Sequence, residues 1–218
     1  MSEAMKVVNQ SVELVDCMGG DVNVVNAARV SFNKVATELG DKDAKLLKYL
    51  ADHNHWSPFS HVFLSFRIKA PIFVARQLVK HQVGLAWNEV SRRYVDSDPE
   101  FFMPDYWRKK AANVKQGSSE EPVYCTEEWQ EAAEYHTKQL FYMYKNMIDN
   151  GICAEQSRMV LPQNMMTEWI WSGSLYAFAR VCNLRLDSHT QKETQEVAKM
   201  ISDLVAEKFP ESWKVLVK

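Results

Sequence analysis

Side chains able to bind a charged ligand are concentrated between Arg76 and Tyr94. Arg92 and Arg93 are adjacent, and each guanidinium group is a planar fork that matches a phosphate or a carboxylate. Asn88 and Glu89 add donors and acceptors that suit ribose hydroxyls or the edge of a base. The stretch therefore predicts a site for a phosphorylated ligand. The alternative is a solvated basic turn in which Glu89 pairs with an arginine, since such surface pairs are common and contribute little.

Two local elements are expected to position this stretch. Pro71 to Gln82 carries apolar residues at helical spacing behind a proline that suits a first helical position, and such a helix places Gln77 and Lys80 on one face. Trp87 to Tyr94 is expected to be extended or loop-like. Val62 to Lys69 alternates apolar and polar residues, which is typical of a strand, and it leads directly into the helix.

The rest of the chain contains further strand and helix patterns. Strands are predicted within Met5 to Met18 and at Thr167 to Trp171, and helices at Asp21 to Arg29, Ala44 to Asn54, Thr126 to Asp149, Ala154 to Leu161, Leu175 to Leu184 and Gln191 to Phe209. Asp21 is expected to cap its own helix. In the longest helix an apolar stripe that includes Trp129 and Met143 is expected to face the core. Asp96 to Pro122 is predicted to be a long surface excursion.

Length and composition limit the classes of protein. The 218 residues are 46% hydrophobic and carry a net charge of −2, and no repeat or second core is evident. We therefore expect one α+β domain over residues 1–218, with a long helix near the C-terminus. No charge excess favours nucleic acid or membrane as a partner, and neither a signal peptide nor a membrane span is predicted, so we expect a soluble cytoplasmic protein.

Four cysteines and a histidine cluster raise the question of a metal site. The cysteines are far apart and show no paired spacing. His53, His55 and His61 lie close together, but Asp52 is the only carboxylate near them, so no metal site is expected. Ser57 followed by a proline instead predicts an N-cap and a first helical residue, which would leave backbone N–H groups for an anion. An ordinary capped turn is the alternative.

Arginines in apolar surroundings form a second group of candidate site residues. Arg158 lies between apolar neighbours, and Arg180 and Arg185 lie within or just beyond a largely apolar helix. An unpaired buried charge is costly, so each is expected to have a partner, either a protein acid or a ligand phosphate. His189 precedes a helix, where the dipole disfavours positive charge and a neutral imidazole is expected.

These segments together resemble the flavin-dependent thymidylate synthases. That family has an Arg-His-Arg triplet followed by a serine, and the matching positions here are Lys80-His81-Gln82 and Ser91. The flanking residues match as well. The resemblance spans about residues 12 to 208, and its further blocks occur in the family's order at residues 27–31, 53–59, 158–162, 183–185 and 187–189.

The resemblance implies a fold, a reaction and an assembly. The expected fold is an antiparallel sheet flanked by helices. The expected reaction is the methylation of deoxyuridine monophosphate (dUMP), with carbon from methylenetetrahydrofolate and hydride from FAD that NADPH has reduced. The expected assembly is a homotetramer with active sites where subunits meet.

Family roles are carried over residue by residue. The residues expected to bind dUMP are Gln77, Lys80, Glu89, Ser91, Arg92, Arg93, Arg158 and Arg185. The residues expected to bind FAD are Ser57, Lys80, His81, Gln82, Asn88, Glu89, Ser174, Tyr176, Arg180 and His189. Arg185 is expected to be catalytic, because a fixed guanidinium near the uracil favours negative charge on the ring. Ser91 has no evident base beside it, so a binding role is favoured over a nucleophilic one.

Some positions differ from the family pattern. Lys80 and Gln82 replace the triplet's arginines, and Tyr176 stands where an arginine is common, with Arg180 nearby as an extra one. Lysine keeps the charge but loses the fork, whereas glutamine loses the charge. An alternative function is therefore a catalytically impaired nucleotide- or flavin-binding protein of the same fold. A third hypothesis is a metal hydrolase built on the histidine cluster.

Overall fold

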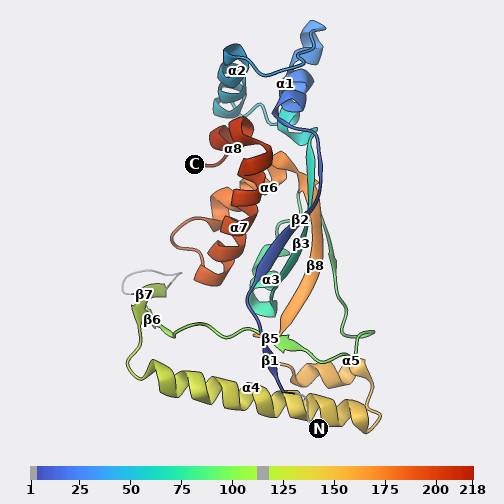
Figure 1. Ribbon diagram of the computed structural model, residues 1–218, viewed down its shortest axis with the longest axis vertical. Helices are drawn as coiled ribbons and strands as arrows, with labels where there is room; N and C mark the ends of the chain where they lie inside the picture. The colour runs from blue at the N-terminus through green and yellow to red at the C-terminus, as the bar shows by residue number, and fades with distance from the viewer. Residues whose placement is uncertain (1–3, 112–117) are drawn as a thin grey trace.

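The structure is a computed structural model that describes residues 4–111 and 118–218. Its centre is a four-stranded sheet in the order β2-β3-β8-β4, in which every neighbouring pair is antiparallel. The strands are β2 (Ser11–Met18), β3 (Phe63–Pro71), β4 (Leu85–Glu89) and β8 (Met166–Ser174). This arrangement, with helices at its face and ends, confirms the α+β fold expected from the resemblance (Figure 1).

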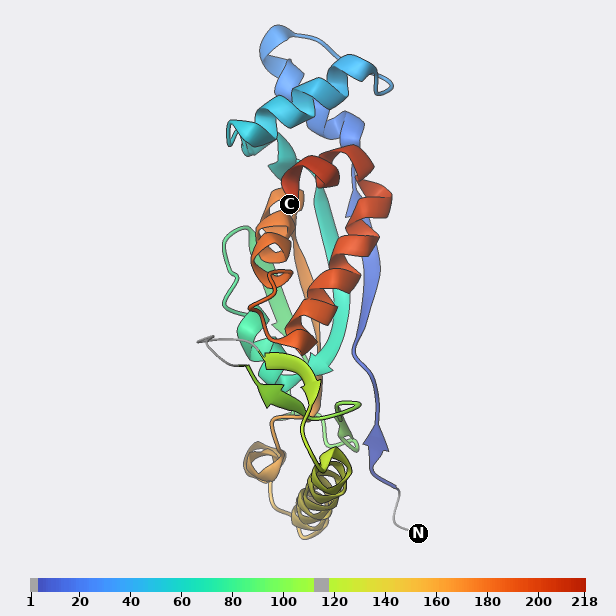
Figure 2. The same ribbon diagram turned by 90° about the vertical axis from the view of Figure 1, so that its left-hand side faces the viewer.

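One face of the sheet is covered by two C-terminal helices. Phe66 of β3 pairs with Trp171 of β8, and both side chains are buried on the same face. Both rings contact Phe178 of α6 (Leu175–Arg185), with centroid distances of 4.9 and 5.4 Å. Figure 2 shows α6 and α7 (Lys192–Lys208) lying across the strands on this side. The alternation predicted for β3 is therefore what separates the core face from the polar face.

One end of the sheet carries α1 (Asp21–Arg29), the 3-10 helix Val30–Phe32, α2 (Asp41–Asp52) and α8 (Pro210–Leu216). The expectation that Asp21 caps its own helix is wrong, because Gly20 is the N-cap. The buried Asp21 carboxylate instead accepts hydrogen bonds from the backbone N–H groups of Glu211 (3.0 Å) and Ser212 (2.9 Å). The side chain thus caps α8, a helix that is remote in sequence.

The opposite end of the sheet carries α4 (Thr126–Asp149), α5 (Ala154–Ser157) and the 3-10 helix Arg158–Val160 (Figure 1). The bounds of α4 agree with the prediction, but its buried face does not. Phe141 and Tyr144 are buried, whereas Trp129 is 61% and Met143 50% exposed. The apolar periodicity therefore predicted that a helix forms here, but not which of its faces is buried. Where α4 crosses the end of the sheet, the face with Phe141 and Tyr144 packs against the protein, and much of the predicted apolar stripe is left exposed.

The excursion between Asp96 and Pro122 contains short strands. β5 (Glu100–Phe101) pairs in parallel with β1 (Lys6–Val7), and Phe101 is fully buried, so the start of the excursion is anchored to the body of the protein. β6 (Arg108–Lys110) pairs with β7 (Ser118–Pro122) as a hairpin whose residues 112–117 lie outside the described chain. Within the described residues, no helix is both long enough and apolar enough to cross a bilayer.

The helix at the centre of the motif region is shorter than predicted. α3 spans Ile72–Leu78, and Pro71 ends β3 with extended backbone as the helix N-cap. His81 N–H donates to the carbonyl of Leu78 at 3.0 Å, so the chain turns there instead of continuing as a helix. Gly84 then takes a positive φ of 77°, which glycine adopts without strain, and β4 follows. Gln77 therefore stays on the helix, whereas His81 belongs to the turn.

Candidate active site

Arg185 and His81 form the closest contact between two predicted site blocks. Arg185 ends α6, and its Nε donates a hydrogen bond to Nε2 of His81 over 2.9 Å. Burial, together with the positive charges of Arg185 and Arg180, lowers the pKa of His81 to about 4. Burial also lowers the pKa of Arg185, yet a guanidinium stays charged at physiological pH. A neutral imidazole thus accepts from a charged fork, which holds that fork in one orientation.

Gln77 contacts the start of α7. Its Nε2 donates a hydrogen bond to Oε1 of Gln191, the N-cap residue of that helix. Gln195, one turn further on, donates through Nε2 to the carbonyl of Asp187 at 2.6 Å. Asp187 Oδ1 accepts from the backbone N–H of His189 at 2.8 Å and lies 2.8 Å from its Nδ1. These bonds to His189 lower the pKa of Asp187 and fix the short loop before α7.

Glu89 on β4 points toward the helix-covered face of the sheet. Its Oε1 accepts from the hydroxyl of Thr167 at 2.7 Å, and its Oε2 accepts from Nε1 of Trp87 at 3.1 Å. Trp87 in turn stacks on Trp169, with ring centroids 4.3 Å apart. Among the described residues no ion pair joins Glu89 to an arginine, so the pairing that the alternative of a solvated basic turn called for does not form. Asn88, one residue earlier on the strand, projects to the opposite face.

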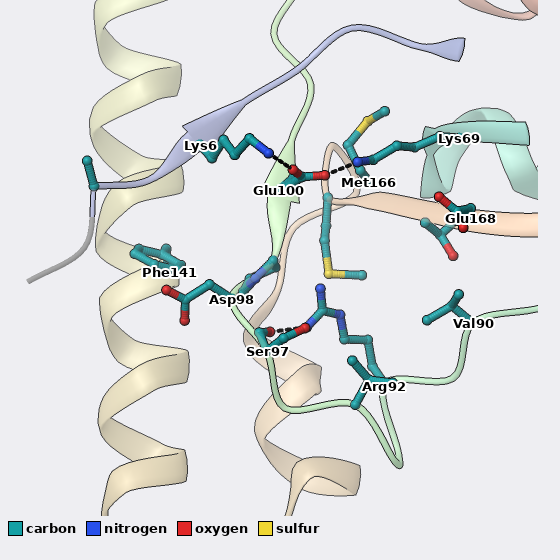
Figure 3. A pocket seen from close by; sticks show the side chains of 15 residues that line it. Lys6, Lys69, Val90, Arg92, Ser97, Asp98, Glu100, Phe141, Met166 and Glu168 are labelled. Atoms are coloured by element: carbon teal, nitrogen blue, oxygen red, sulfur yellow. Dashed lines mark hydrogen bonds and ion pairs between the residues drawn. The ribbon is translucent and has the colours of Figure 1, made fainter. Parts of the chain in front are cut away.

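The adjacent arginines lie in different surroundings. Arg93 Nε donates to Oγ of Ser91 at 3.2 Å, and its guanidinium carbon lies 4.9 Å from the ring centroid of Tyr94. Arg92 instead donates to the backbone carbonyl of Ser97 and borders a separate cavity of about 630 Å³ (Figure 3). Ser91 therefore has an arginine neighbour rather than a base, in agreement with a binding role.

Side chains that form ion pairs with one another line the cavity beside Arg92. Lys6 and Lys69 reach the Glu100 carboxylate from two sides (Figure 3). The hydrogen bonds from Lys6 and then Lys69 hold the pKa of Glu100 below its usual range. Across the same sheet face Arg67 pairs with Glu168 at 2.7 Å. The two lysines share one carboxylate and Arg67 has a carboxylate of its own, so each of these three cations already has an acidic partner within the protein.

A second cavity, of about 340 Å³, brings together residues predicted to bind the cofactor. Tyr176 and Arg180 of α6 line it, with Ser174 at the helix start, Gly84 of the turn and Trp56 on the facing segment. Ser174 Oγ accepts from Ala177 N–H at 3.2 Å and caps α6. The rings of Trp56 and Tyr176 lie 6.2 Å apart. Three segments remote in sequence therefore supply an aromatic wall, a cation and exposed backbone.

Ser57 lies beside this cavity but does not cap its helix as expected. It is the first residue of the 3-10 helix Ser57–Ser60, for which Trp56 is the N-cap, and no side-chain capping bond forms. The proline is therefore one position later than predicted. Lys80 and Gln82 are both exposed in the turn that follows α3.

Arg158 lies apart from the other candidate residues. It is exposed in the 3-10 helix beside α4, where its Nε donates to the carbonyl of Glu155 at 3.3 Å. No contact within the described residues joins it to Arg93 or Arg185. One protomer thus brings together the groups around Arg185, Gln77 and the cofactor cavity, but it leaves Arg158 outside them.

The histidine cluster has no metal-binding geometry. His53 Nδ1 lies 2.8 Å from the carbonyl of Tyr49, and its ring packs on the Tyr49 ring at 4.1 Å. His53, His55 and His61 are all exposed. Within residues 4–111 and 118–218, no group of three or more His, Cys, Asp or Glu side chains is placed to hold a metal ion. The metal hydrolase hypothesis therefore has no ligand set here.

Sequence reasoning missed several residues that position the predicted ones. Trp87 and Thr167 orient Glu89. Trp87 lies two residues before Glu89 on β4, whereas Thr167 contacts it from β8, 78 residues further along the chain, and no local pattern marks that second contact. Gln191 and Gln195 hold Gln77 and Asp187. Both glutamines lie within six residues after the block at residues 187–189, and this closeness could have marked them as candidates.

Comparisons with known proteins identify the family. The profile described as Thy1, thymidylate synthase complementing protein, matches residues 13–211. A relative from Thermosipho africanus, named flavin-dependent thymidylate synthase, is 36% identical over 206 residues, covering 94% of this chain and 90% of the relative. A Thermotoga neapolitana relative of the same name is 37% identical over 209 residues, with 95% and 90% covered.

A solved structure gives the same fold. The crystal structure of the UMP/dUMP methylase PolB from Streptomyces cacaoi, bound with 5-Br dUMP, superposes with a TM-score of 0.86 at 29% identity. The superposition covers 97% of this chain and 96% of that one. The likeness therefore includes the sheet, its helices and the motif segments between them.

Proposed function

The chain belongs to the Thy1 family of flavin-dependent thymidylate synthases, and from this premise we propose that it methylates dUMP to dTMP with FAD as its cofactor. The contact between Arg185 and His81 carries the proposal. It joins the motif triplet to the block near the end of α6, which lies 104 residues further along the chain. Neither block forms a binding site alone, and the fold places a charged fork where they meet.

The proposed catalytic role of Arg185 follows from its charge and its fixed position. A guanidinium held against the uracil stabilises negative charge on the ring, and this makes the reactive carbon more nucleophilic. Removing one such preorganised donor typically costs about 3 kcal/mol in the barrier. His81 contributes by remaining neutral and accepting from Arg185 Nε, so the terminal nitrogens remain available to the nucleotide.

Further residues are proposed to hold the nucleotide. Gln77 offers an amide whose orientation is fixed by Gln191. Glu89 offers a carboxylate fixed by two hydrogen bonds, and Arg93 offers a fork beside the Ser91 hydroxyl. This set provides the charge for a phosphate and the acceptors for sugar or base donors. Lys80 and Arg92 are kept as dUMP contacts by resemblance alone.

The 340 Å³ cavity fits part of a flavin dinucleotide. Arg180 supplies a cation for a phosphate, and Trp56 and Tyr176 supply a wall for a planar ring. We propose that Ser57, Lys80, His81, Gln82, Asn88, Glu89, Ser174, Tyr176, Arg180 and His189 hold FAD. When bound, FAD reduced by NADPH supplies hydride for the carbon delivered by methylenetetrahydrofolate. The protein's part is to bind and orient it.

A homotetramer with shared sites accounts for Arg158. This residue is exposed and remote in its own protomer, so we propose that it reaches the dUMP site of a neighbouring subunit. The exposed Trp129 and Met143 on α4 support burial against another chain. Light scattering gives the mass of the assembly. Mixing inactive Arg158→Ala and Arg185→Ala subunits should restore part of the activity if each site draws on two chains.

An anaerobic assay with dUMP, methylenetetrahydrofolate, NADPH and FAD tests the function directly. We expect dTMP to form and to depend on all four compounds. UMP belongs in a parallel assay, because the similar PolB structure is described as a UMP/dUMP methylase. Flavin absorbance and dUMP binding without product would favour the catalytically impaired alternative. We also propose, from the resemblance, that residues 1–218 form one domain and that the enzyme works in the cytoplasm.

A further inference from the structure

A buried ion pair attaches the β6–β7 hairpin to the start of α7. Arg108 Nη2 lies 2.7 Å from Oε1 of Glu193, and the two side chains are only 16% and 8% exposed. Arg108 Nε also donates to Oγ of Ser118 at 2.7 Å, so one guanidinium links both strands of the hairpin to the helix. The neighbouring pair Lys109–Glu121 is also an ion pair, but its side chains are 51% and 71% exposed.

Glu193 depends on Arg108 for neutralisation. Its second oxygen, Oε2, is buried and has no hydrogen-bond partner among the described residues. A carboxylate in this setting is costly to bury unless a cation pairs with it. Gln10 contacts the same residue only at its backbone carbonyl, at 3.1 Å. The position of the Glu193 side chain is therefore set by the hairpin arginine.

The first turn of α7 connects Glu193 to the proposed nucleotide site through hydrogen bonds. Gln191, two residues before Glu193, accepts backbone bonds from Thr194 and Gln195 at 3.0 Å each. Its side chain accepts from Gln77 Nε2. Because these hydrogen bonds join Gln191 to the first turn of α7, we expect a shift of Glu193 to move Gln191 and, with it, the amide of Gln77.

The burial of an ion pair is weak evidence that its only role is to stabilise the fold. Apolar residues of similar volume often stabilise a fold as well or better, whereas a charged pair adds a fixed direction and register. Here the contacts run from Arg108 in the β6–β7 hairpin, through Glu193 and the first turn of α7, to Gln77 of the proposed dUMP site.

We propose that Arg108, acting through Glu193 and Gln191, is a positioning residue that orients Gln77 for dUMP. The inference rests on the proposed function, because it takes Gln77 as a dUMP contact. Loss of this link weakens binding of the nucleotide more than it slows the chemical step, since Arg108 touches neither the uracil nor the flavin cavity.

The test compares Arg108→Ala, Arg108→Lys, Gln77→Ala and the double variant Arg108→Ala/Glu193→Gln in the FAD-loaded protein. Calorimetry gives the Kd for dUMP, steady-state kinetics separate KM from kcat, and thermal unfolding reports stability. We expect Arg108→Ala to raise the dUMP Kd and KM about tenfold, the effect of one lost hydrogen bond to a ligand, with kcat nearly unchanged. Arg108→Lys should recover part of the affinity. Lys109→Ala, in the same hairpin, should leave all three measurements at wild-type values.

The double variant separates positioning from stability. It carries no unpaired buried charge, so its stability should exceed that of Arg108→Ala while its dUMP affinity stays low. Recovery of both stability and affinity would overturn the proposal, as would wild-type affinity in both Arg108→Ala and the double variant while Gln77→Ala binds weakly. If Gln77→Ala itself binds dUMP normally, the dUMP role of Gln77 fails and the inference fails with it. If the wild-type protein binds no dUMP, the proposed function fails.

Discussion

Arg185 Nε lies 2.9 Å from Nε2 of His81, and this bond exists only while the histidine is neutral. Protonation would put a hydrogen on the accepting nitrogen and a second positive charge beside the guanidinium. Burial and the charges of Arg185 and Arg180 oppose that protonation by holding the pKa of His81 at about 4. The catalytic fork is therefore held by a residue whose charge state the site itself determines.

Stability should depend on pH through His81. Its pKa falls from 6.5 in the unfolded chain to about 4 in the folded protein, so the folded state binds fewer protons between these values. The free energy of unfolding should therefore decrease as pH drops from 6.5 toward 4. His81→Gln keeps an acceptor that does not titrate, and it should flatten this part of the curve. Chemical denaturation at several pH values measures it, and identical slopes for both proteins would refute the assignment.

Arg185→Ala should reduce turnover severely without unfolding the protein. Loss of one preorganised donor lowers kcat by about 10²- to 10³-fold. Bound FAD should remain, because Arg185 does not line the cofactor cavity. Arg185→Lys keeps the charge but loses the fork, so it should stay strongly impaired. The measurements are dTMP formation and flavin absorbance. Wild-type turnover in the alanine variant would rule out uracil activation by this residue.

Gln82→Arg should tighten flavin binding. Gln82 is exposed in the turn next to the cofactor cavity, where the family usually has an arginine. A guanidinium there adds one partly exposed contact to a phosphate or to the ring, which lowers the FAD Kd by about two- to fivefold. Fluorescence titration of the apoprotein measures it. Gln82→Met, a side chain of similar length without a charge, is the matched control, and equal affinities for the two variants would place Gln82 away from FAD.

Gly173→Ala should disturb the edge of the cofactor cavity. A methyl group at Gly173 would lie 2.4 Å from the carbonyl oxygen of Gly84 and 2.6 Å from Leu85, so β4 and the turn must move. Overpacking of this kind costs about 1–3 kcal/mol, and FAD affinity should fall as well. Gly40→Ala is the control, because its methyl group meets Asp43 at an ordinary 3.8 Å. Thermal unfolding and flavin titration of the two variants test this, and matching results would contradict it.

Several elements were readable from sequence because they depend on local spacing. The alternation from Val62 to Lys69 predicted β3, and the repeat from Thr126 to Asp149 predicted α4 with its observed bounds. The motif blocks identified the family before any geometry was known. The cap at Asp21 was assigned to the wrong helix, since a carboxylate accepts from any N–H that folding brings near it, and here those belong to α8.

The long helices, the strands β3 and β8, the family and the chemical types of the site residues could be predicted from the sequence, because period and residue type are properties of short segments. Which groups pair, and which face of an element is buried, depended on the fold as a whole. It paired Arg185 with His81 and Gln77 with Gln191, separated Arg92 from Arg93, and left Trp129 exposed on α4. These outcomes depend on contacts between residues far apart along the chain, and no local periodicity encodes which distant groups will meet.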